Sequence, residues 1–248
     1  MKISVITAVY NNREHVAEAL DSVLAQSHPE VELVVIDGGS TDGTLDVLRG
    51  YGDRIAVLVS EPDQGIYDAL NKGIRLATGD VIGFLHSDDV FADADSLARV
   101  TSGFLSEDID AVYGDLVYVR RDNTQSIVRR WKSGTFTLGR LREGWMPPHP
   151  AFYARRSVYE RLGGFDTSYR IAADYDCMLR FLSSGIRTVY VPQVLVKMRL
   201  GGASNRSLKN VIQKSREDYR ALRENRVGGL GTLLCKNFSK LPQFLRRG

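Results

Sequence analysis

The sequence has few cysteines and no long hydrophobic run, and each shortage excludes a class of protein. Cys177 and Cys235 are the only cysteines and lie far apart in a chain of 248 residues, so we expect neither a disulfide scaffold nor a thiolate metal site. No apolar stretch approaches the length of a membrane span. The opening residues become polar after a short apolar run, so we expect no signal peptide. A reduced, cytoplasmic protein is therefore predicted.

The composition is ordinary for a globular protein, but the charge is unevenly distributed. The chain is 43% hydrophobic and 25% charged, with a formal net charge of +3, and it is long enough to bury a core. Residues 206–248 contain 11 Lys and Arg against 3 Asp and Glu, whereas the remainder contains 22 against 27. A basic tail on an acidic body indicates either an anionic partner or a solvated basic helix.

Strand and helix patterns alternate along the first half of the chain. Short, almost wholly apolar runs predict strands over residues 3–9, 31–36, 55–59 and 81–85. Apolar residues at helical spacing predict helices over 13–27, 41–49 and 66–77, with Asn11 or Asn12 capping the first. This alternation is typical of an α/β fold with a mainly parallel, doubly wound sheet. Ligands then bind beyond the carboxyl ends of the strands, which points to residues 7–12, 37–44, 60–65 and 86–89.

The second half is less regular. Strands are expected over 111–119, 126–131 and 188–198, and a helix over 173–184. Residues 138–149 contain Gly, Trp and Pro-Pro, and we expect a loop there. A polar amphipathic helix follows from Leu208 and is broken at Gly228 and Gly229.

Three polar segments lie at the predicted strand ends. Residues 37–44 (DGGSTDGT) combine a carboxylate with glycines that let the backbone approach a ligand, although Asp42 capping the next helix is the alternative. The neighbouring carboxylates Asp88 and Asp89 suit Mg²⁺ or Mn²⁺ completed by substrate phosphates, and a helix cap is again the alternative. In residues 61–73, Asp68, Asn71 and Lys72 lie within about one helical turn and can face a shared site.

Together these segments resemble the nucleotide-sugar half of inverting family-2 glycosyltransferases, which have the GT-A fold. The resemblance covers residues 1–200 approximately and is nearest to bacterial exopolysaccharide enzymes of the colanic-acid type. The matching stretches are 7–11 (TAVYN), 36–44 (IDGGSTDGT), 63–73 (DQGIYDALNKG), 77–80 (ATGD) and 84–89 (FLHSDD). The resemblance implies a catalytic domain over 1–204, with a nucleotide-sugar half (1–110) and an acceptor half (111–204). The charge and apolar spacing of residues 205–248 predict a basic amphipathic helical tail after it.

The resemblance also implies residue roles in the first half. A nucleotide-diphosphate sugar, UDP-linked in preference to GDP-linked, would contact Thr7, Val9, Asp37, Gly65, Asp68, Asn71, Lys72 and Ser87. A divalent metal, Mn²⁺ or Mg²⁺, would bind Asp88 with Asp89 beside it. His86 stands where the family motif has its first acidic residue, and a neutral imidazole there can bond the ribose or ligate the metal.

In the second half, the segment 172–176 (AADYD) looks like the family stretch that carries the catalytic base. Ala173 replaces the usual Glu, so the resemblance makes Asp174 the base and Asp176 a supporting group; a simple helix cap is the alternative for Asp174. His149 matches a recurrent family segment and would contact the donor phosphates or the acceptor; the alternative is a structural role. Trp145 would stack on a sugar face; the alternative is a place in the core.

The implied reaction is a direct displacement at the anomeric carbon, in which Asp174 takes the proton of the acceptor hydroxyl. Apolar residues from Leu230 onward fall near one helical face, and lysines and arginines supply charge, although Pro242 must kink or end that helix. Residues 230–248 therefore predict either binding to an anionic membrane or packing on protein. A lipid-linked glycan acceptor at the inner face of the plasma membrane, in bacterial polysaccharide biosynthesis, fits the former. The arginines of 120–132 would meet an acceptor pyrophosphate or form a solvated hairpin.

Two rival functions are weighed against this one. A nucleotidyltransferase would usually carry a Gly-rich, basic phosphate loop after the first strand, where this chain has residues 7–12 (TAVYNN). A non-catalytic nucleotide-sugar-binding protein would keep Asp37 and Asp88 without needing Asp174. Nucleic acid is not an expected partner, because the basic tail lacks interleaved aromatic residues or a known reading motif. The oligomeric state is not predicted.

Overall fold

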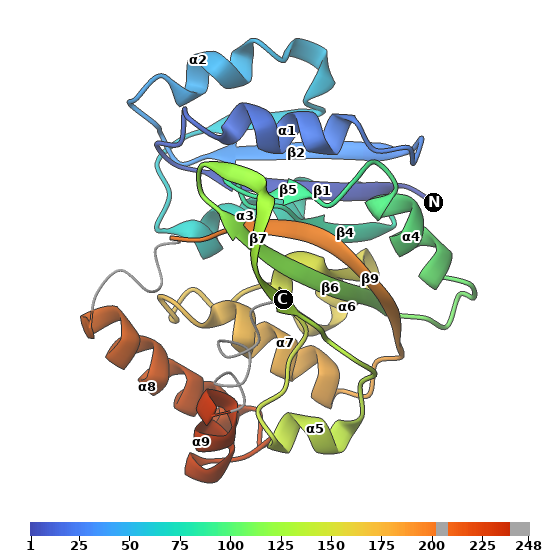
Figure 1. The fold of residues 1–248 in the computed structure, drawn as a ribbon, viewed down its shortest axis with the longest axis vertical. Helices are drawn as coiled ribbons and strands as arrows, with labels where there is room; N and C mark the ends of the chain where they lie inside the picture. Colours follow the sequence, from blue (N-terminus) through green and yellow to red (C-terminus); the bar gives the residue numbers. More distant parts are fainter. Residues whose placement is uncertain (202–207, 239–248) are drawn as a thin grey trace.

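The computed structural model describes residues 1–201 and 208–238 (Figure 1). Its strands are β1 (Ile3–Val9), β2 (Val31–Asp37), β3 (Val57–Ser60), β4 (Val81–Phe84), β5 (Val90–Phe91), β6 (Ala111–Arg120), β7 (Asn123–Trp131), β8 (Phe152–Arg155) and β9 (Thr188–Arg199). Its helices are α1 (Val16–Leu24), α2 (Thr44–Arg49), α3 (Ile66–Leu76), α4 (Ser96–Gly103), α5 (Leu138–Arg142), α6 (Arg156–Leu162), α7 (Ala173–Ser183), α8 (Leu208–Glu224) and α9 (Leu230–Phe238). Two 3-10 turns, Gly52–Arg54 and His149–Ala151, complete the elements.

One mixed sheet runs through the molecule in the order β3-β2-β1-β4-β8-β6-β9-β5, and β7 pairs with β6. The strands of the first half, β3, β2, β1 and β4, are all parallel. β8 lies antiparallel between β4 and β6, while β6 and β9 are parallel. The sheet therefore has a doubly wound parallel half that continues into a half with mixed strand directions. This confirms the predicted α/β class, with a regular first half and an irregular second half.

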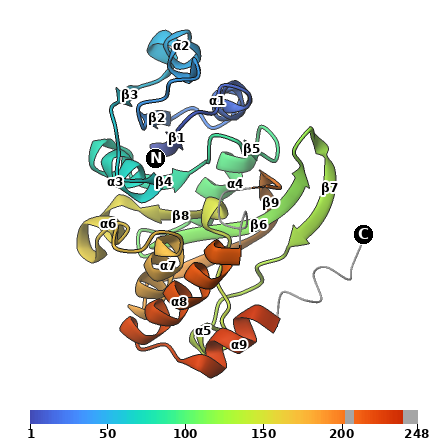
Figure 2. The same cartoon turned by 90° about the vertical axis from the view of Figure 1, so that its left-hand side faces the viewer.

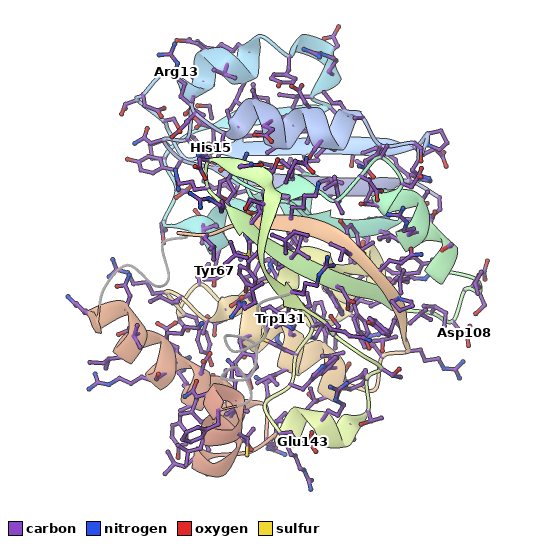
Figure 3. The ribbon with its side chains drawn as sticks, viewed as in Figure 1. Arg13, His15, Tyr67, Asp108, Trp131 and Glu143 are labelled. Atoms are coloured by element: carbon purple, nitrogen blue, oxygen red, sulfur yellow. The ribbon has the colours of Figure 1, made fainter. Side chains whose placement is uncertain are left out.

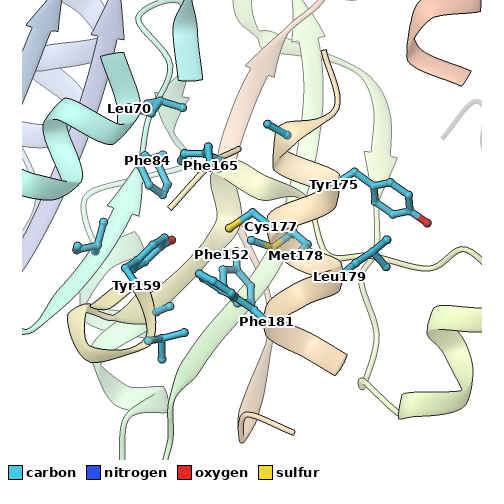
Figure 4. Close-up of a cluster of buried hydrophobic side chains, with 14 of the residues drawn as sticks. Leu70, Phe84, Phe152, Tyr159, Phe165, Tyr175, Cys177, Met178, Leu179 and Phe181 are labelled. Carbon is cyan, nitrogen blue, oxygen red and sulfur yellow. The ribbon is translucent and has the colours of Figure 1, made fainter. Parts of the chain in front are cut away.

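Alternate residues of the central strands enter two different cores, as the period of two along a strand requires. In β1, Ile6 and Ala8 join the cluster under α3 and α7, whereas Ile3, Val5 and Val9 join the one under α1 and α4. Figure 2 shows α1 and α3 on opposite faces of β1 and β2. Aromatic side chains from β4, β8 and α6 pack against α7 in the first cluster (Figure 4).

Some local predictions were wrong in instructive ways. Neither Asn11 nor Asn12 caps α1, which begins after His15 without a side-chain cap. Asn12 Nδ2 instead donates to Ser87 Oγ (2.9 Å), and Asn11 Oδ1 accepts from the Thr41 amide (2.8 Å). The two asparagines thus tie neighbouring loops together. The expected loop 138–149 also contains the short helix α5.

Helix α8 packs on α7 through buried polar contacts. Glu217 accepts from the backbone amides of residues 170, 171 and 172, and Asn225 Nδ2 donates to Asp176 Oδ1 at 2.7 Å. The proposed boundary after residue 204 falls outside the described residues, as do residues 239–248 of the proposed tail. Within the described ranges, we find no helix with the length and apolarity that a membrane span demands.

Candidate active site

The carboxyl ends of β1, β2 and β3 place one carboxylate in a buried position. Val9 pairs with Asp37, and Asp37 pairs with Ser60. The Asp37 carboxylate is buried and accepts from Ser60 Oγ (2.6 Å) and the Ser40 amide (3.2 Å). Thr7 is also fully buried, and its hydroxyl has no hydrogen-bond partner within the described residues. Thr7, Val9 and Asp37 are therefore brought together where the parallel strands end.

The loops after β1, β2 and β3 lie close together. A Cβ on Gly38 would lie 2.4 Å from Asp63 Oδ2, so the Asp63 side chain lies directly against the Gly38 backbone. Asn11 adopts a left-handed φ of 49°, and its amide donates to Ser40 Oγ at 2.8 Å. Tyr10, 64% exposed, lies beside Gly38. Tyr10 stands inside the matching stretch 7–11, but no role was predicted for it.

The start of α3 gathers an ion cluster. Gly65 precedes the helix at φ 115°, and Asp68 Oδ2 accepts from the Gln64 amide (3.1 Å). Lys72 Nζ lies 2.9 Å from Glu61 Oε1 and 3.5 Å from Asp68 Oδ2. The hydrogen bond to Glu61 and the charge of Asp68 raise the pKa of Lys72, which therefore stays cationic.

Asn71 lies apart from this cluster. Its Nδ2 donates to the Phe165 carbonyl and its Oδ1 accepts from the Phe165 amide, both at 2.8 Å. This pair of bonds ties α3 to the segment before α7. The structure thus brings Asp68 and Lys72 together and directs Asn71 to the backbone of the second half.

The two aspartates after β4 have different surroundings. Asp89 is buried, and its Oδ1 accepts from the Arg199 amide at 2.9 Å. Burial and the adjacent charge of Asp88 raise the pKa of Asp89 well above its usual range. Asp88 is half-buried and makes no side-chain hydrogen bond within the described residues. Asp88 is therefore the carboxylate free to meet a ligand.

Arg199 was not anticipated as part of this site. Its guanidinium donates to the backbone carbonyls of Asp88 and Arg121 and to the carboxylate of Glu18. It thereby holds the turn that presents Asp88, and a lone Arg at the end of a strand gives no local signal of that role.

Two histidines face each other beside the carboxylates. The His86 and His149 rings are 6.1 Å apart, and His149 stacks on Phe84 at 4.9 Å. Burial and the nearby His86 lower the pKa of His149 to about 3, and its buried Nε2 has no partner within the described residues. Burial also lowers the pKa of His86, against the charges of Asp88 and Asp174. Both rings are therefore neutral at neutral pH.

Asp174 lies in the first turn of α7, where the helix dipole favours a carboxylate. Its Oδ1 accepts from the Tyr175 amide (2.8 Å) and lies 3.4 Å from Tyr67 Oη. The residue in the capping position is Ala172, and no side chain caps the helix. Ala173, where the resemblance expects Glu, is fully buried in the core. Asp174 is thus the carboxylate that α7 offers on the side of His86.

Tyr67 of α3, labelled in Figure 3, contacts the segment that precedes α7. Its Oη lies 2.6 Å from the carbonyl of Ile171. Burial, followed by the charge of Asp174, raises the pKa of Tyr67 well above its usual range, so the phenol remains a donor. Tyr67 belongs to the matching stretch 63–73 but had been given no role.

Asp176 is two residues along α7 and faces away from Asp174, because two residues turn a helix by about 200°. It is buried against α8, where it accepts from Asn225 and pairs with Arg180 at 3.5 Å. Asp174 and Asp176 therefore do not share a site.

A groove of about 250 Å³ lies between β6, β7, α5 and α9. Its lining residues are Tyr118, Arg129, Trp131, Lys132, Arg140, Glu143, Gly144, Trp145, Met146 and Lys236. The Trp145 indole donates to the Ser133 carbonyl (2.8 Å) and stacks on Phe136, and the Arg140 guanidinium lies over the ring at 4.9 Å from its centre. Burial raises the pKa of Tyr118, although the Arg129 guanidinium, 3.9 Å from the ring centre, acts in the opposite direction.

The donor set fits a divalent cation that shares its coordination with a substrate. Within the described residues, no three His, Cys, Asp or Glu side chains gather as a complete metal site. Asp88 has a free carboxylate, and Asp89 Oδ2 is buried without a partner in the described part of the chain. One or two carboxylates completed by phosphate oxygens and water are what Mg²⁺ and Mn²⁺ accept. Asp88, with Asp89 behind it, would hold such an ion.

Comparisons with known proteins agree with this geometry. The model of the family described as "Glycosyl transferase family 2" matches residues 4–163. A PGL/p-HBAD biosynthesis glycosyltransferase of Mycobacterium bovis is 37% identical over 210 residues, which cover 82% of this chain and 78% of the relative.

Solved structures share the fold at low identity. TarS residues 1–349 of S. aureus, in complex with UDP-GlcNAc, has a TM-score of 0.73 and 21% identity over 92% of this chain and 66% of that one. This chain spans 39% of a longer TarS structure. The mannosyltransferase PcManGT of Pyrobaculum calidifontis, with GDP-Man and Mn²⁺, has a TM-score of 0.69 and 22% identity over 98% of this chain and 70% of that one.

Proposed function

Because the chain belongs to glycosyl transferase family 2, we propose that it is an inverting, metal-dependent enzyme that moves a sugar from a UDP-sugar to an acceptor hydroxyl. Glycosyl transfer from a nucleotide sugar is the activity of the family. The inversion, the metal and the UDP-linked donor are the proposed refinements. The observation that carries the proposal is the Asp174 carboxylate, which lies at the start of α7 beside Tyr67 and whose charge acts on His86, as that of Asp88 does.

The chemistry follows from these residues. Asp174 takes the proton of the acceptor hydroxyl as that oxygen attacks the anomeric carbon, and a positioned base of this kind contributes about 10²–10⁴-fold. Attack opposite the leaving diphosphate inverts the configuration, so no enzyme nucleophile is needed. A divalent cation on Asp88 would supply positive charge next to that diphosphate when bound. Tyr67 positions Asp174, and Asp176 supports it by fixing α7 against α8.

The proposed donor pocket spans the strand ends. Asp37 and Thr7 would hold the base with Val9, and Tyr10 would cover it. Beyond the nucleotide, Gly65, Asp68, Lys72 and Ser87 line the path toward Asp88, while Asn71 keeps α3 in register with the second half. The UDP-GlcNAc in TarS and the GDP-Man in PcManGT support a nucleotide sugar as the ligand of this pocket.

The acceptor would lie in the groove lined by Tyr118, Trp131 and Trp145. Aromatic rings suit the apolar faces of a sugar, and Arg129, Lys132 and Arg140 suit a phosphate on a lipid-linked glycan. The name of the mycobacterial relative refers to glycosylation in PGL/p-HBAD biosynthesis. We therefore propose a lipid-linked acceptor in bacterial polysaccharide or glycolipid synthesis, reached by peripheral attachment to the inner face of the plasma membrane.

Thermal unfolding with UDP-, GDP- and dTDP-sugars, each with and without Mn²⁺, tests the donor assignment. A ligand of the native state raises its stability by about 2.7 kcal/mol at a hundredfold excess over Kd. We expect a UDP-sugar with Mn²⁺ to raise the Tm of the wild type but not of Asp88→Ala. Asp46→Ala, an exposed aspartate on α2, is the matched control. A Tm that no nucleotide sugar changes, or one that Mn²⁺ leaves unaffected, would count against the proposal.

A further inference from the structure

Helix α9 buries polar side chains and exposes large apolar ones. Thr232 and Lys236 are 8% and 2% exposed, whereas Leu230, Leu234 and Phe238 are 65%, 55% and 62% exposed. The three apolar residues repeat every four positions and lie within an arc of about 80°. A surface helix normally has the opposite arrangement. Here Leu230, Leu234 and Phe238 are called the apolar stripe.

Specific contacts fix α9 in this orientation. Lys236 Nζ lies 2.8 Å from the buried Asp218 of α8 and 3.1 Å from the centre of the Tyr175 ring. A Cβ on Gly144 would be 2.4 Å from Lys236 Cβ, so α9 lies directly against the end of α5. Rotating the apolar stripe inward would bury the stripe only by exposing this ion pair. The stripe therefore stays on the surface.

Helices α5, α8 and α9 lie at the same end of the molecule (Figure 1). Residues of these helices and of the α8–α9 connection line a basic pocket. Its volume is about 490 Å³, and its lining residues are Arg142, Arg223, Arg226, Val227, Gly228 and Thr232. None of these described lining residues is acidic. Guanidinium groups bind phosphate oxygens in pairs of parallel hydrogen bonds. The pocket thus offers three such groups next to the helix that carries the apolar stripe.

We propose that the arginine pocket and the apolar stripe together form the docking surface for an anionic lipid bilayer. The stripe enters the boundary between headgroups and acyl chains, and Arg142, Arg223 and Arg226 bind lipid phosphates. This inference rests on the membrane attachment in the proposed function and assigns residues to it. In this orientation α9 lies against the membrane. Because Lys236 of α9 lines the acceptor groove, the groove then lies near the membrane that would supply a lipid-linked acceptor.

The positive charge of this surface indicates which partner covers it. Residues 239–248, which follow the stripe in sequence, add Lys240, Arg246 and Arg247 and no acidic residue. A second copy docked through the same face would bring arginines against arginines, which costs free energy. A free phosphate would use the pocket and leave the stripe uncovered. An anionic bilayer satisfies both parts, because polybasic segments and apolar side chains bind it together.

The test is co-sedimentation of the full chain with vesicles of phosphatidylglycerol and, separately, of phosphatidylcholine. The pocket variant is Arg223→Gln with Arg226→Gln, and the stripe variant is Leu234→Ser with Phe238→Ser. The control, Arg49→Gln with Arg75→Gln, removes the same charge from exposed sites on α2 and α3. We expect about tenfold or greater loss of phosphatidylglycerol binding in the pocket variant, a loss for both vesicles in the stripe variant, and no loss in the control.

Each contrary outcome identifies a different error. Equal vesicle binding by pocket variant and control would overturn the phosphate assignment. A wild type that ignores vesicles but gains thermal stability from glycerol 3-phosphate would have a site for a soluble phosphate instead. Conversion of a dimer to a monomer by the stripe variant, without vesicle binding, would make a second copy the occupant. Stabilisation by UDP-sugar, measured on every variant, reports separately on the donor site and on folding.

Discussion

At the scale of single residues, Asp174 has what a general base requires and its neighbour Asp176 does not. Asp174 is half-buried near Tyr67 and His86, whereas Asp176 is bound by Asn225 and Arg180. The two carboxylates share one helix, so they allow a contrast in which the element, the residue type and the substitution are the same. Because their surroundings differ, we expect substitution of Asp174 to affect turnover and substitution of Asp176 to affect stability.

We expect Asp174→Asn to lower kcat by about 10²–10⁴-fold while the nucleotide sugar still raises the Tm, because the amide cannot take a proton. Asp176→Asn should lower the Tm and leave the turnover of the folded enzyme near that of the wild type. Steady-state kinetics and thermal unfolding of both variants provide the measurements. If Asp174→Asn turns over at the wild-type rate, Asp174 is not the base.

Much of the donor half could be predicted residue by residue, because its residues lie at strand ends. Thr7, Val9 and Asp37 are adjacent through parallel pairing, which an alternating strand and helix pattern implies. The partners of Asn12 and Asn71 could not be predicted. Their contacts with Ser87 and Phe165 span 75 and 94 positions and leave no local pattern.

At the scale of elements, Glu32 joins β1, β2 and the loop before β4. This buried carboxylate accepts from Lys2 Nζ (2.6 Å), Ser4 Oγ (2.5 Å), and the Thr78 amide and hydroxyl. Burial would raise the pKa of Glu32, but these hydrogen bonds outweigh it and lower the pKa to about 2. A single carboxylate inside an apolar strand gives no local signal of this role, because the role depends on three segments meeting.

The lowered pKa predicts a dependence of stability on pH. The unfolded carboxyl has a pKa of 4.5, so the stabilisation is complete above that pH and is lost as the pH falls toward about 2. The total is on the order of 3 kcal/mol, from about 1.4 kcal/mol per pKa unit. We expect the unfolding free energy of Glu32→Gln to fall less steeply than that of the wild type between pH 4.5 and 2, as measured by urea titration. Glu160→Gln, which changes an exposed carboxylate on α6, should not have this effect. Parallel curves for Glu32→Gln and the wild type would contradict this.

Long, regular elements were predictable and short connecting ones were not. The predicted strand 3–9 agrees with β1, since its apolar run is as long as the strand. β8 has four residues and α6 has seven, too few for a period of two or 3.6 to show. β8 joins the parallel half of the sheet to β6, so this connection was not predicted. The larger elements of the second half, β6, α7 and β9, lie within one residue of the predicted ranges 111–119, 173–184 and 188–198.

At the scale of the whole molecule, Lys236 connects regions that the sequence treats as separate. It pairs with Asp218 of α8, lies over Tyr175 of α7 and lines the acceptor groove, while its helix also lines the arginine pocket. The segment after residue 204 was predicted as an amphipathic helical tail that either binds a membrane or packs on protein. In the described residues, α8 and α9 are fixed to α7 by buried polar groups that no amphipathic pattern would indicate.

Removing one partner of this buried pair should be far costlier than removing both. Lys236→Met leaves Asp218 uncompensated in the interior, and we expect a loss of about 3–5 kcal/mol in unfolding free energy. Lys236→Met combined with Asp218→Leu should recover most of that loss, since neither charge is then stranded. Lys209→Met, an exposed lysine on α8, is the control and should change little. Urea unfolding of the four proteins measures this. If the single variant matched the control, α9 would not be held by this pair, and the fixed orientation of the apolar stripe would lose its basis.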